Sequence, residues 1–264
     1  MTPTYVIAEA GACHDGDFQK MMALIDVAAR AGADACKFQW TSDPESMASR
    51  RGDAVRDGYA DVYRRYLAWD ASWHQKLAAA CKDKQIDYLC TVYLRQDIDV
   101  VAPHVAAFKV SSFEALDDVF VAAHLHREKD VLVSIGMAQK GELERSAAWC
   151  FDDDVTLMQC TSSYPAAIAD LNLAVIGGQV RGFSDHSAPD ETWTGALAVA
   201  AGARTIEAHI RLVDTAADNP DRPHAMTDLQ FKDYVRHIRF AEVAMGESDI
   251  QRVQAEASML RYRV

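Results

Sequence analysis

The chain has 264 residues, of which 50% are hydrophobic and 25% are charged, so it is long enough to bury one large hydrophobic core. This composition excludes a disordered chain, a coiled coil and a collagen-like repeat. Lysine and arginine number 27 against 39 aspartates and glutamates, and the net charge of -12 disfavours nonspecific binding to nucleic acid or to an anionic membrane. A small anionic ligand therefore needs a local pocket of positive charge.

No uncharged apolar run reaches the roughly 18 residues that a membrane-spanning helix needs. The N-terminal sequence MTPTYVIAEAGACHDGD has no basic segment and meets a charge at Glu9, which argues against a secretory signal. The six cysteines show no CxxC spacing, which indicates reduced thiols. We therefore expect a soluble, cytoplasmic protein with neither a membrane nor a nucleic-acid partner.

Short apolar runs alternate with amphipathic stretches along the whole chain, a pattern typical of α/β proteins. We predict eight strands at Thr4–Gly11, Ala35–Trp40, Asp87–Tyr93, Ala107–Ser112, Asp130–Gly136, Val155–Ser162, Val180–Ser187 and Thr205–Leu212. Helices are predicted at Phe18–Ala31, Ala71–Lys84, Leu116–Arg127, Gly141–Cys150, Thr192–Ala201 and Asp228–Ala244, with weaker patterns near Asp97 and Leu173. The first helix has one apolar stripe, made of Met21, Leu24, Ile25 and Ala28, and Gly32 marks its end.

Eight strands that alternate with helical segments within about 250 residues indicate a (β/α)8 TIM barrel. We assign the catalytic barrel to residues 1–246 and a C-terminal helical extension to residues 247–264. Residues 41–70 form the longest irregular region, and a long loop after a barrel strand is typically a lid or an oligomer contact. We therefore also expect that a homodimer, if it forms, uses the barrel or this loop.

Polar residues gather at the carboxyl ends of the predicted strands, which in a barrel face the catalytic mouth. An unpaired buried ammonium is costly, so Lys37 and Lys109 within apolar strands imply a bound anion or a carboxylate between them. A structural ion pair with Glu9 or Glu207 is the plainer alternative. The hydroxyls that would complete a cradle for a phosphate and a carboxylate belong to Thr91, Ser112 and Ser184.

His186 and His209 end neighbouring strands, so their imidazoles can converge on one metal ion; two packed core histidines are the alternative. Because the pattern shows no clear third carboxylate, it indicates a labile Mn2+ or Mg2+ site more than structural zinc, and Zn2+ stays open. His14 and Asp15 precede the first helix, either as part of its cap or as functional groups. Residues 218–224, DNPDRPH, form either a proline turn or a substrate loop.

Eight sequence pieces occur in one order along nearly the whole chain: IAEAGACHDGD, AGADACKFQ, FKVSSFE, LVSIGMA, QCTSSYPA followed by LNL, GFSDHS, GALAVAAGARTIEAHI, and the NPD of residues 219–221. With these pieces the chain resembles the sialic acid synthase family, the phosphoenolpyruvate-dependent synthases of N-acetylneuraminate and related nonulosonates. The resemblance implies an enzyme that joins phosphoenolpyruvate to an aldose or another aldehyde. The products would be phosphate and a 3-deoxy-2-keto acid.

The resemblance also implies roles for residues at the barrel mouth. Phosphoenolpyruvate would be bound by Lys37, Thr91, Lys109, Ser112, Ser162 and Ser184. The acceptor would lie toward Gln39, Glu114, Tyr164 and Asp221, and the divalent ion would be held by His186 and His209. The catalytic set would be Glu9, Lys37, Lys109 and Glu207. In this set Glu9 would orient water or stabilise positive charge at C2 of phosphoenolpyruvate.

The sequence departs from the family mainly on the acceptor side. Cys13, Gln159 and Ile135 stand where an asparagine, a histidine and a threonine are usual. Ala208 and Ile210 flank the last histidine in place of a basic residue and a phenylalanine. The family's C-terminal antifreeze-like domain, which supplies an arginine to the partner's sugar site, has no counterpart in these residues. We therefore expect an acceptor other than N-acetylmannosamine, or a separate protein that provides the lid.

Two other functions fit parts of the same pattern. A Schiff-base aldolase needs a strand-end lysine, here Lys37 or Lys109, and has no use for the histidine pair. A non-catalytic regulatory protein would retain phosphoenolpyruvate recognition and lack turnover. The condensing synthase accounts for Glu9, His186 and His209 together, so it is the hypothesis that we favour.

Overall fold

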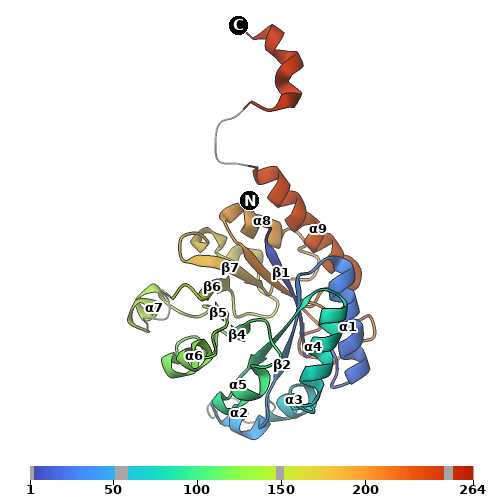
Figure 1. The fold of residues 1–264 in the computed structure, drawn as a ribbon, viewed down its shortest axis with the longest axis vertical. Helices are drawn as coiled ribbons and strands as arrows, with labels where there is room; N and C mark the ends of the chain where they lie inside the picture. The colour runs from blue at the N-terminus through green and yellow to red at the C-terminus, as the bar shows by residue number, and fades with distance from the viewer. Residues whose placement is uncertain (1–2, 51–58, 147–151, 247–251, 264) are drawn as a thin grey trace.

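A computed structural model describes residues 3–50, 59–146, 152–246 and 252–263. At its centre, eight parallel strands pair in sequence order, and the first pairs with the last to close the sheet (Figure 1). This arrangement confirms the predicted (β/α)8 TIM barrel. The strands are β1 (Tyr5–Gly11), β2 (Ala35–Trp40), β3 (Asp87–Val92), β4 (Phe108–Val110), β5 (Val131–Ser134), β6 (Val155–Cys160), β7 (Val180–Asp185) and β8 (Thr205–His209).

Helices surround the barrel and connect most consecutive strands (Figure 1). They are α1 (Phe18–Ala31), α2 (Pro44–Arg50), α3 (Tyr59–Tyr66), α4 (Trp73–Asp83), α5 (Arg95–Val101), α6 (Asp118–Leu125), α7 (Lys140–Ser146), α8 (Thr194–Ala201) and α9 (Asp228–Met245). Two 3-10 turns join β6 to β7, namely η3 (Ile168–Asp170) and η4 (Leu173–Val175), and a third 3-10 segment, η5 (Gln254–Tyr262), follows α9. The end of the helix predicted at Gly141–Cys150 lies outside the described residues.

Helix α1 has the capping groups and the buried stripe that its sequence predicts. Asp17 caps the helix, since its side chain accepts a hydrogen bond from the backbone N of Gln19 at 2.6 Å. The chain leaves the helix at Gly32, whose φ of 86° is left-handed. The predicted stripe is buried and consists of Met21, Leu24, Ile25 and Ala28.

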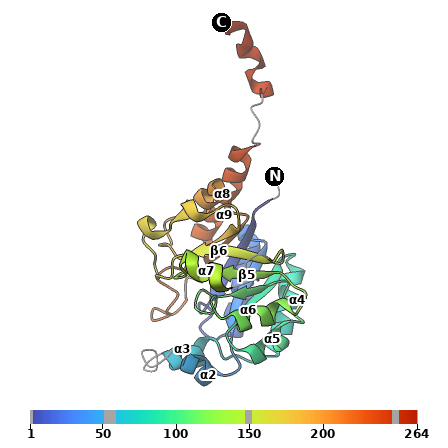
Figure 2. The ribbon, with the colours of Figure 1, turned by 90° about the vertical axis from the view of Figure 1, so that its left-hand side faces the viewer.

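Residues 41–70 contain two helices, so the expectation of an irregular loop was wrong for this part of the chain. Helix α2 begins at Pro44, a residue suited to the first helical position, and the Asp43 side chain accepts hydrogen bonds from two backbone amides of the first turn. Helix α3 buries Tyr63 and Tyr66. Figure 2 shows α2 and α3 beside each other at one end of the molecule. A homodimer contact through this region stays a prediction.

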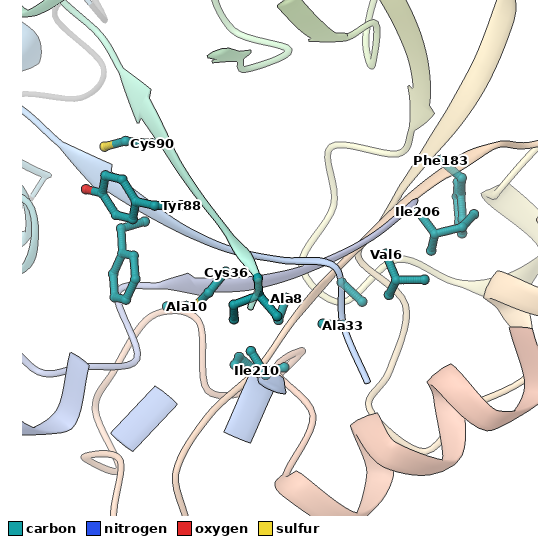
Figure 3. Close-up of a cluster of buried hydrophobic side chains, with 14 of the residues drawn as sticks. Val6, Ala8, Ala10, Ala33, Cys36, Tyr88, Cys90, Phe183, Ile206 and Ile210 are labelled. Carbon is teal, nitrogen blue, oxygen red and sulfur yellow. The ribbon is translucent and has the colours of Figure 1, made fainter. Parts of the chain in front are cut away.

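Successive side chains of strand β1 face alternately outward, toward the helices, and inward, toward the centre of the barrel. Val6, Ala8 and Ala10 belong to the outer core, which they share with neighbouring strands and with the surrounding helices (Figure 3). Between them, Ile7 belongs to a separate inner cluster. That cluster forms the apolar floor of the barrel and consists of Ile7, Ala35, Leu89, Leu132 and Met158.

The inner face becomes polar one step further along the strands. Residues two apart on a strand face the same side, so the next inward side chains lie one layer closer to the C-terminal mouth. They are Glu9 after Ile7, Lys37 after Ala35, Thr91 after Leu89, and Ser134 after Leu132. An apolar floor therefore supports a charged and polar layer at the mouth.

The boundary that we place at residue 246, between the barrel and a C-terminal extension, borders residues outside the described ranges and stays a prediction. No helix within the described ranges is long and apolar enough to cross a membrane. Five of the cysteines are described, and all five are free thiols and buried, as expected. The sixth, Cys150, lies outside the described residues.

His124 on α6 is a packing residue. It is buried against the rings of Phe108 and Phe120. Burial lowers its pKa to about 4, whereas an unfolded chain protonates histidine near a pKa of about 6.5. The folded protein therefore loses stability to the protonated unfolded chain as the pH falls from about 6.5 toward 4.

Replacing His124 with leucine should remove this part of the acid sensitivity. Between pH 7 and pH 5 we expect the difference in unfolding free energy between variant and wild type to move by about 2 kcal/mol in favour of the variant. Urea denaturation at both pH values measures it, with exposed His126→Leu as the control. A difference that is the same at both pH values would contradict the assignment of a neutral buried imidazole.

Candidate functional site

Four buried charged side chains form the centre of the polar layer, and we call Glu9, Lys37, Lys109 and Glu207 the charge quartet. Lys37 Nζ lies 2.7 Å from Glu9 Oε2 and 3.6 Å from Glu207 Oε2. Lys109 Nζ lies 3.6 Å from Glu207 Oε1. The ion pairs named above as the plainer alternative are therefore present, and Glu207 is shared between the two lysines.

Each member of the quartet also has a neutral hydrogen-bond partner. Buried charges need such partners, because pairing alone rarely offsets the loss of hydration. The donor–acceptor pairs are Lys37 to Thr91 (3.0 Å), Lys109 to Ser134 (2.7 Å), Ser184 to Glu207 (2.9 Å) and Gln39 to Glu9 (2.7 Å). The quartet is thus balanced in charge, and its neutral partners lie on four strands, β2, β3, β5 and β7.

Burial and pairing set the protonation of the quartet. Burial alone would raise the pKa of Glu207, but the ammonium groups of Lys109 and Lys37 outweigh it and hold that pKa well below its ordinary value. Burial would lower the pKa of Lys37, yet Glu207 and Glu9 raise it above the ordinary value. For Lys109 burial prevails over the attraction of Glu207, and the pKa is lowered. Lys109 is therefore the more easily deprotonated of the two lysines.

Replacing Glu207 with glutamine should destabilise the fold, because two buried ammonium groups would then face one carboxylate. We expect the free energy of unfolding to fall by about 3–5 kcal/mol, and adding Lys109→Met should recover a large part of the loss by restoring the balance. Urea denaturation at pH 7 compares the single and double variants with surface Glu144→Gln. A single variant as stable as the wild type would refute the balancing role of Glu207.

His186 and His209 lie close together at the ends of β7 and β8, with ring centroids 5.7 Å apart. His186 Nδ1 lies 2.8 Å from the backbone oxygen of Thr161, which makes Nδ1 the donor and leaves Nε2 as the acceptor nitrogen. Burial, reinforced by the neighbouring His209, lowers the pKa of His186 to about 3. The ring is therefore neutral at physiological pH, which is the form that binds a metal ion.

The loop after β8 brings two further groups to His209. Asp221 Oδ2 lies 3.6 Å from His209 Nδ1, and the ring of His224 lies 4.4 Å from that of His209, centroid to centroid. One donor atom from each of these three residues lies within 4.8 Å of the others. The described residues thus contain a candidate His/Asp site for a divalent ion. Asp221 supplies a carboxylate that the sequence pattern had not connected with the histidines.

Contacts to the loop after β1 hold the β8 loop in place. Asn219 Nδ2 donates to the backbone oxygen of Ala12 and to Asp15 Oδ1, both at 2.8 Å. The backbone N of Ala12 donates to Asp221 Oδ2 at 2.6 Å. Gly11 makes this approach feasible, since its φ is 49° and a Cβ there would lie 2.1 Å from Asp221 Oδ2. Asp15 is therefore an anchor for the β8 loop, while the cap of α1 is a different aspartate.

Ser112 and Ser162 meet across the mouth, on the loops after β4 and β6. Their Oγ atoms lie 2.9 Å apart. Gly136 leaves room for this contact, because a Cβ at that position would lie 2.6 Å from Ser162 Oγ. Two hydroxyls on separate loops thus converge where the sequence placed part of a phosphoenolpyruvate cradle.

The four residues assigned to the acceptor lie on different parts of the mouth. Gln39 contacts Glu9, and Asp221 lies beside His209, as described above. The ring of Tyr164 lies 4.5 Å from that of His186, centroid to centroid. Glu114 accepts a hydrogen bond from Ser111 in the loop after β4. The roles of these residues toward an acceptor remain proposals.

Ser134 and His224 belong to the site but were not among the predicted residues. For Ser134 the signal was present, because it lies two residues after inward-facing Leu132, in the same register as the other polar residues. His224 lies in the segment 218–224, which we had considered as a substrate loop. A single histidine in a loop gives no sign of metal binding until the course of the loop is known.

A closed parallel barrel, with paired charges and a candidate metal site at the C-terminal ends of its strands, has the features of a (β/α)8 enzyme, whose active site lies at this face. A family model described as the NeuB family matches residues 24–250. The chain belongs to the NeuB family. Family membership makes it a phosphoenolpyruvate-dependent condensing synthase of the sialic acid synthase type.

Individual relatives and solved structures agree with this assignment. The chain is 30% identical to a pseudaminic acid synthase of Campylobacter jejuni over 98% of its own length and 79% of the relative's. It is 31% identical to the spore coat polysaccharide biosynthesis protein SpsE of Bacillus subtilis, over 93% of this chain and 69% of that protein. The crystal structure of an N-acetylneuraminic acid synthetase from Leptospira borgpetersenii superposes with a TM-score of 0.87 at 25% identity, covering 99% of this chain and 92% of that one.

Proposed function

We propose that the chain joins phosphoenolpyruvate to the aldehyde carbon of a sugar and releases phosphate and a 3-deoxy-2-keto acid of the nonulosonic type. The observation that supports this most directly is the pair of lysines, Lys37 and Lys109, buried at the mouth and surrounded by hydroxyl groups. A ligand with a phosphate and a carboxylate needs fixed cations, and in this acidic chain they lie inside the barrel.

In this proposal phosphoenolpyruvate shares the lysines with the carboxylates of the quartet. Lys109 and Glu207 are 3.6 Å apart, which is longer than a charge-assisted hydrogen bond, so Lys109 can turn toward an incoming anion at small cost. Lys37 stays close to Glu9 and keeps its positive charge. The proposed phosphoenolpyruvate contacts are those of Lys37, Lys109, Thr91, Ser112, Ser162 and Ser184.

The proposed reaction forms a bond at C3 of phosphoenolpyruvate and exchanges phosphate for water at C2. Carbon C3 attacks the aldehyde carbon, a new C–C bond forms, and the aldehyde oxygen takes up a proton to become a hydroxyl. Positive charge develops at C2 and water adds there, after which the bond from C2 to the phosphate oxygen breaks. In this proposal Glu9 stabilises the charge at C2 and accepts the proton from water. Glu207 keeps both lysines in position.

The residues near β8 fit a divalent ion. His186 is a neutral imidazole, and His209 lies beside a carboxylate. We assign His186 and His209 as groups that hold the ion, and Mn2+ as its first candidate ahead of Mg2+ and Zn2+. Such an ion, when bound, polarises the carbonyl oxygen of the acceptor.

For the acceptor we propose a sugar aldehyde other than N-acetylmannosamine. The altered positions named above support this, among them Gln159, which donates a hydrogen bond to the backbone oxygen of Leu171 at 3.0 Å. Relatives named as pseudaminic acid and N,N'-diacetyllegionaminic acid synthases carry the names of different products, which supports a change of acceptor within the family. A separate protein that closes the mouth is the second proposal for this side of the site.

Phosphate release from phosphoenolpyruvate tests the proposal. Purified protein with Mn2+ is offered a panel of aldoses, N-acylhexosamines and simple aldehydes, and we expect release that requires one acceptor class. His186→Ala, Lys109→Met and a chelator should each lower the rate by about 100-fold or more, because the first and the last remove the ion or a group that holds it and the second removes a lysine charge. Lys82→Met, at an exposed lysine of α4, is the matched control and should retain the wild-type rate.

The same assay separates the alternatives. Activity that survives the chelator, together with borohydride trapping on Lys109 or Lys37, would contradict the synthase and support a Schiff-base aldolase. Binding of phosphoenolpyruvate without release with any acceptor would support a regulatory protein or a missing lid protein. Efficient synthesis of N-acetylneuraminate by the chain alone would refute the altered acceptor.

A further inference from the structure

His224, in the loop after β8, is a buried side chain whose ring nitrogens make no hydrogen bond in the described part of the molecule. It is 3% exposed, and neither of its ring nitrogens has a hydrogen-bond partner among the described residues. Burying an imidazole in this state is costly, so such a ring in a folded protein indicates a partner that is not a protein group.

The surroundings of His224 define what that partner is. The centroid of its ring lies 4.4 Å from that of His209 and 6.3 Å from that of His186. One donor atom from each of His209, Asp221 and His224 lies within 4.8 Å of the others. Metal–ligand bonds of about 2.0–2.2 Å place neighbouring donor atoms roughly 3–4 Å apart, so small side-chain rotations close this group around one ion.

We propose that His224 is a further direct ligand of the divalent ion that His186 and His209 hold in the proposed function, and that Asp221 supplies the carboxylate of the same site. The ring of His186 borders this group on its β7 side, with its centroid 5.7 Å from that of His209. Asp221, which the resemblance assigns to the acceptor, then acts on the acceptor through the ion. The inference rests on the proposed function for the role of the ion in turnover, but binding of the ion is measured without turnover.

The ligand set also selects the kind of ion. Imidazoles with one carboxylate suit first-row transition ions, whereas Mg2+ prefers oxygen ligands and gives up its water reluctantly. Such ions accept up to six ligands, so positions stay open for water and for an acceptor oxygen. We therefore expect Mn2+, Co2+ and Zn2+ to bind much more tightly than Mg2+.

Calorimetric titration of the chelator-treated full chain with Mn2+ tests the site. His224→Ala and the larger His224→Gln should each weaken Mn2+ binding by about 100-fold or more, since both remove a ligand. The exposed residue His126 provides the matched control, His126→Ala, which should bind Mn2+ like the wild type. With Co2+, loss of one nitrogen ligand should also alter the visible absorption spectrum.

A purely structural role for His224 predicts that both variants are less stable than the wild type without metal. The proposed role as a metal ligand predicts instead that both variants keep the wild-type melting temperature without metal, because the ring nitrogens have no partner among the described residues, and lose the increase that Mn2+ gives the wild type. Unchanged Mn2+ affinity in folded variants would overturn the proposal. A wild type that binds Mn2+ through His224 but releases no phosphate from phosphoenolpyruvate would contradict the proposed function and leave the metal site standing.

Discussion

The charge quartet constrains the rest of the structure, because two lysines and two glutamates inside a barrel are tolerated only when each faces its opposite. Glu9 and Lys37 are paired in the register of β1 with β2, and Ser184 is paired with Glu207 in that of β7 with β8. A shift of one residue in any of these strands would turn its polar side chain into the outer apolar core. Strand register and charge balance therefore depend on each other.

This arrangement explains how an acidic chain can bind an anionic substrate. The net charge of -12 disfavours anions over most of the surface, while two ammonium groups are fixed at the bottom of the mouth. Since Glu9 and Glu207 neutralise them in the free protein, the proposed ligand anion would replace part of an existing ion pair. The loops after β1 and β8, joined through Asn219, bring the candidate metal site close to the charge quartet, where Glu9 of β1 pairs in register with His209 of β8.

The fold and much of the charged layer could be predicted because they depend on local pattern. The alternation of Ile7 with Glu9, or of Ala35 with Lys37, is visible in the sequence once the strands are recognised. Ion pairs of the lysines with Glu9 or Glu207 were an alternative at the level of sequence, but the sharing of Glu207 by both lysines could not be predicted, since it depends on the closure of the barrel. His224 was missed for a related reason: the contacts that hold its loop come from residues about 200 positions away, at Ala12 and Asp15. The helices within 41–70 are short and depend on packing against each other and against Ala12 and Tyr93 of neighbouring loops, which the local sequence does not show.

In the proposed mechanism, water attacks C2 of phosphoenolpyruvate and the bond between C2 and the phosphate oxygen breaks. Phosphoenolpyruvate labelled with 18O in the oxygen that bridges C2 and phosphorus tests it directly, with the active acceptor and 31P NMR of the released phosphate. We expect the label to leave in the phosphate and to shift the 31P resonance of that phosphate. Unlabelled phosphate would mean that the bond between phosphorus and oxygen breaks instead, and it would contradict the mechanism.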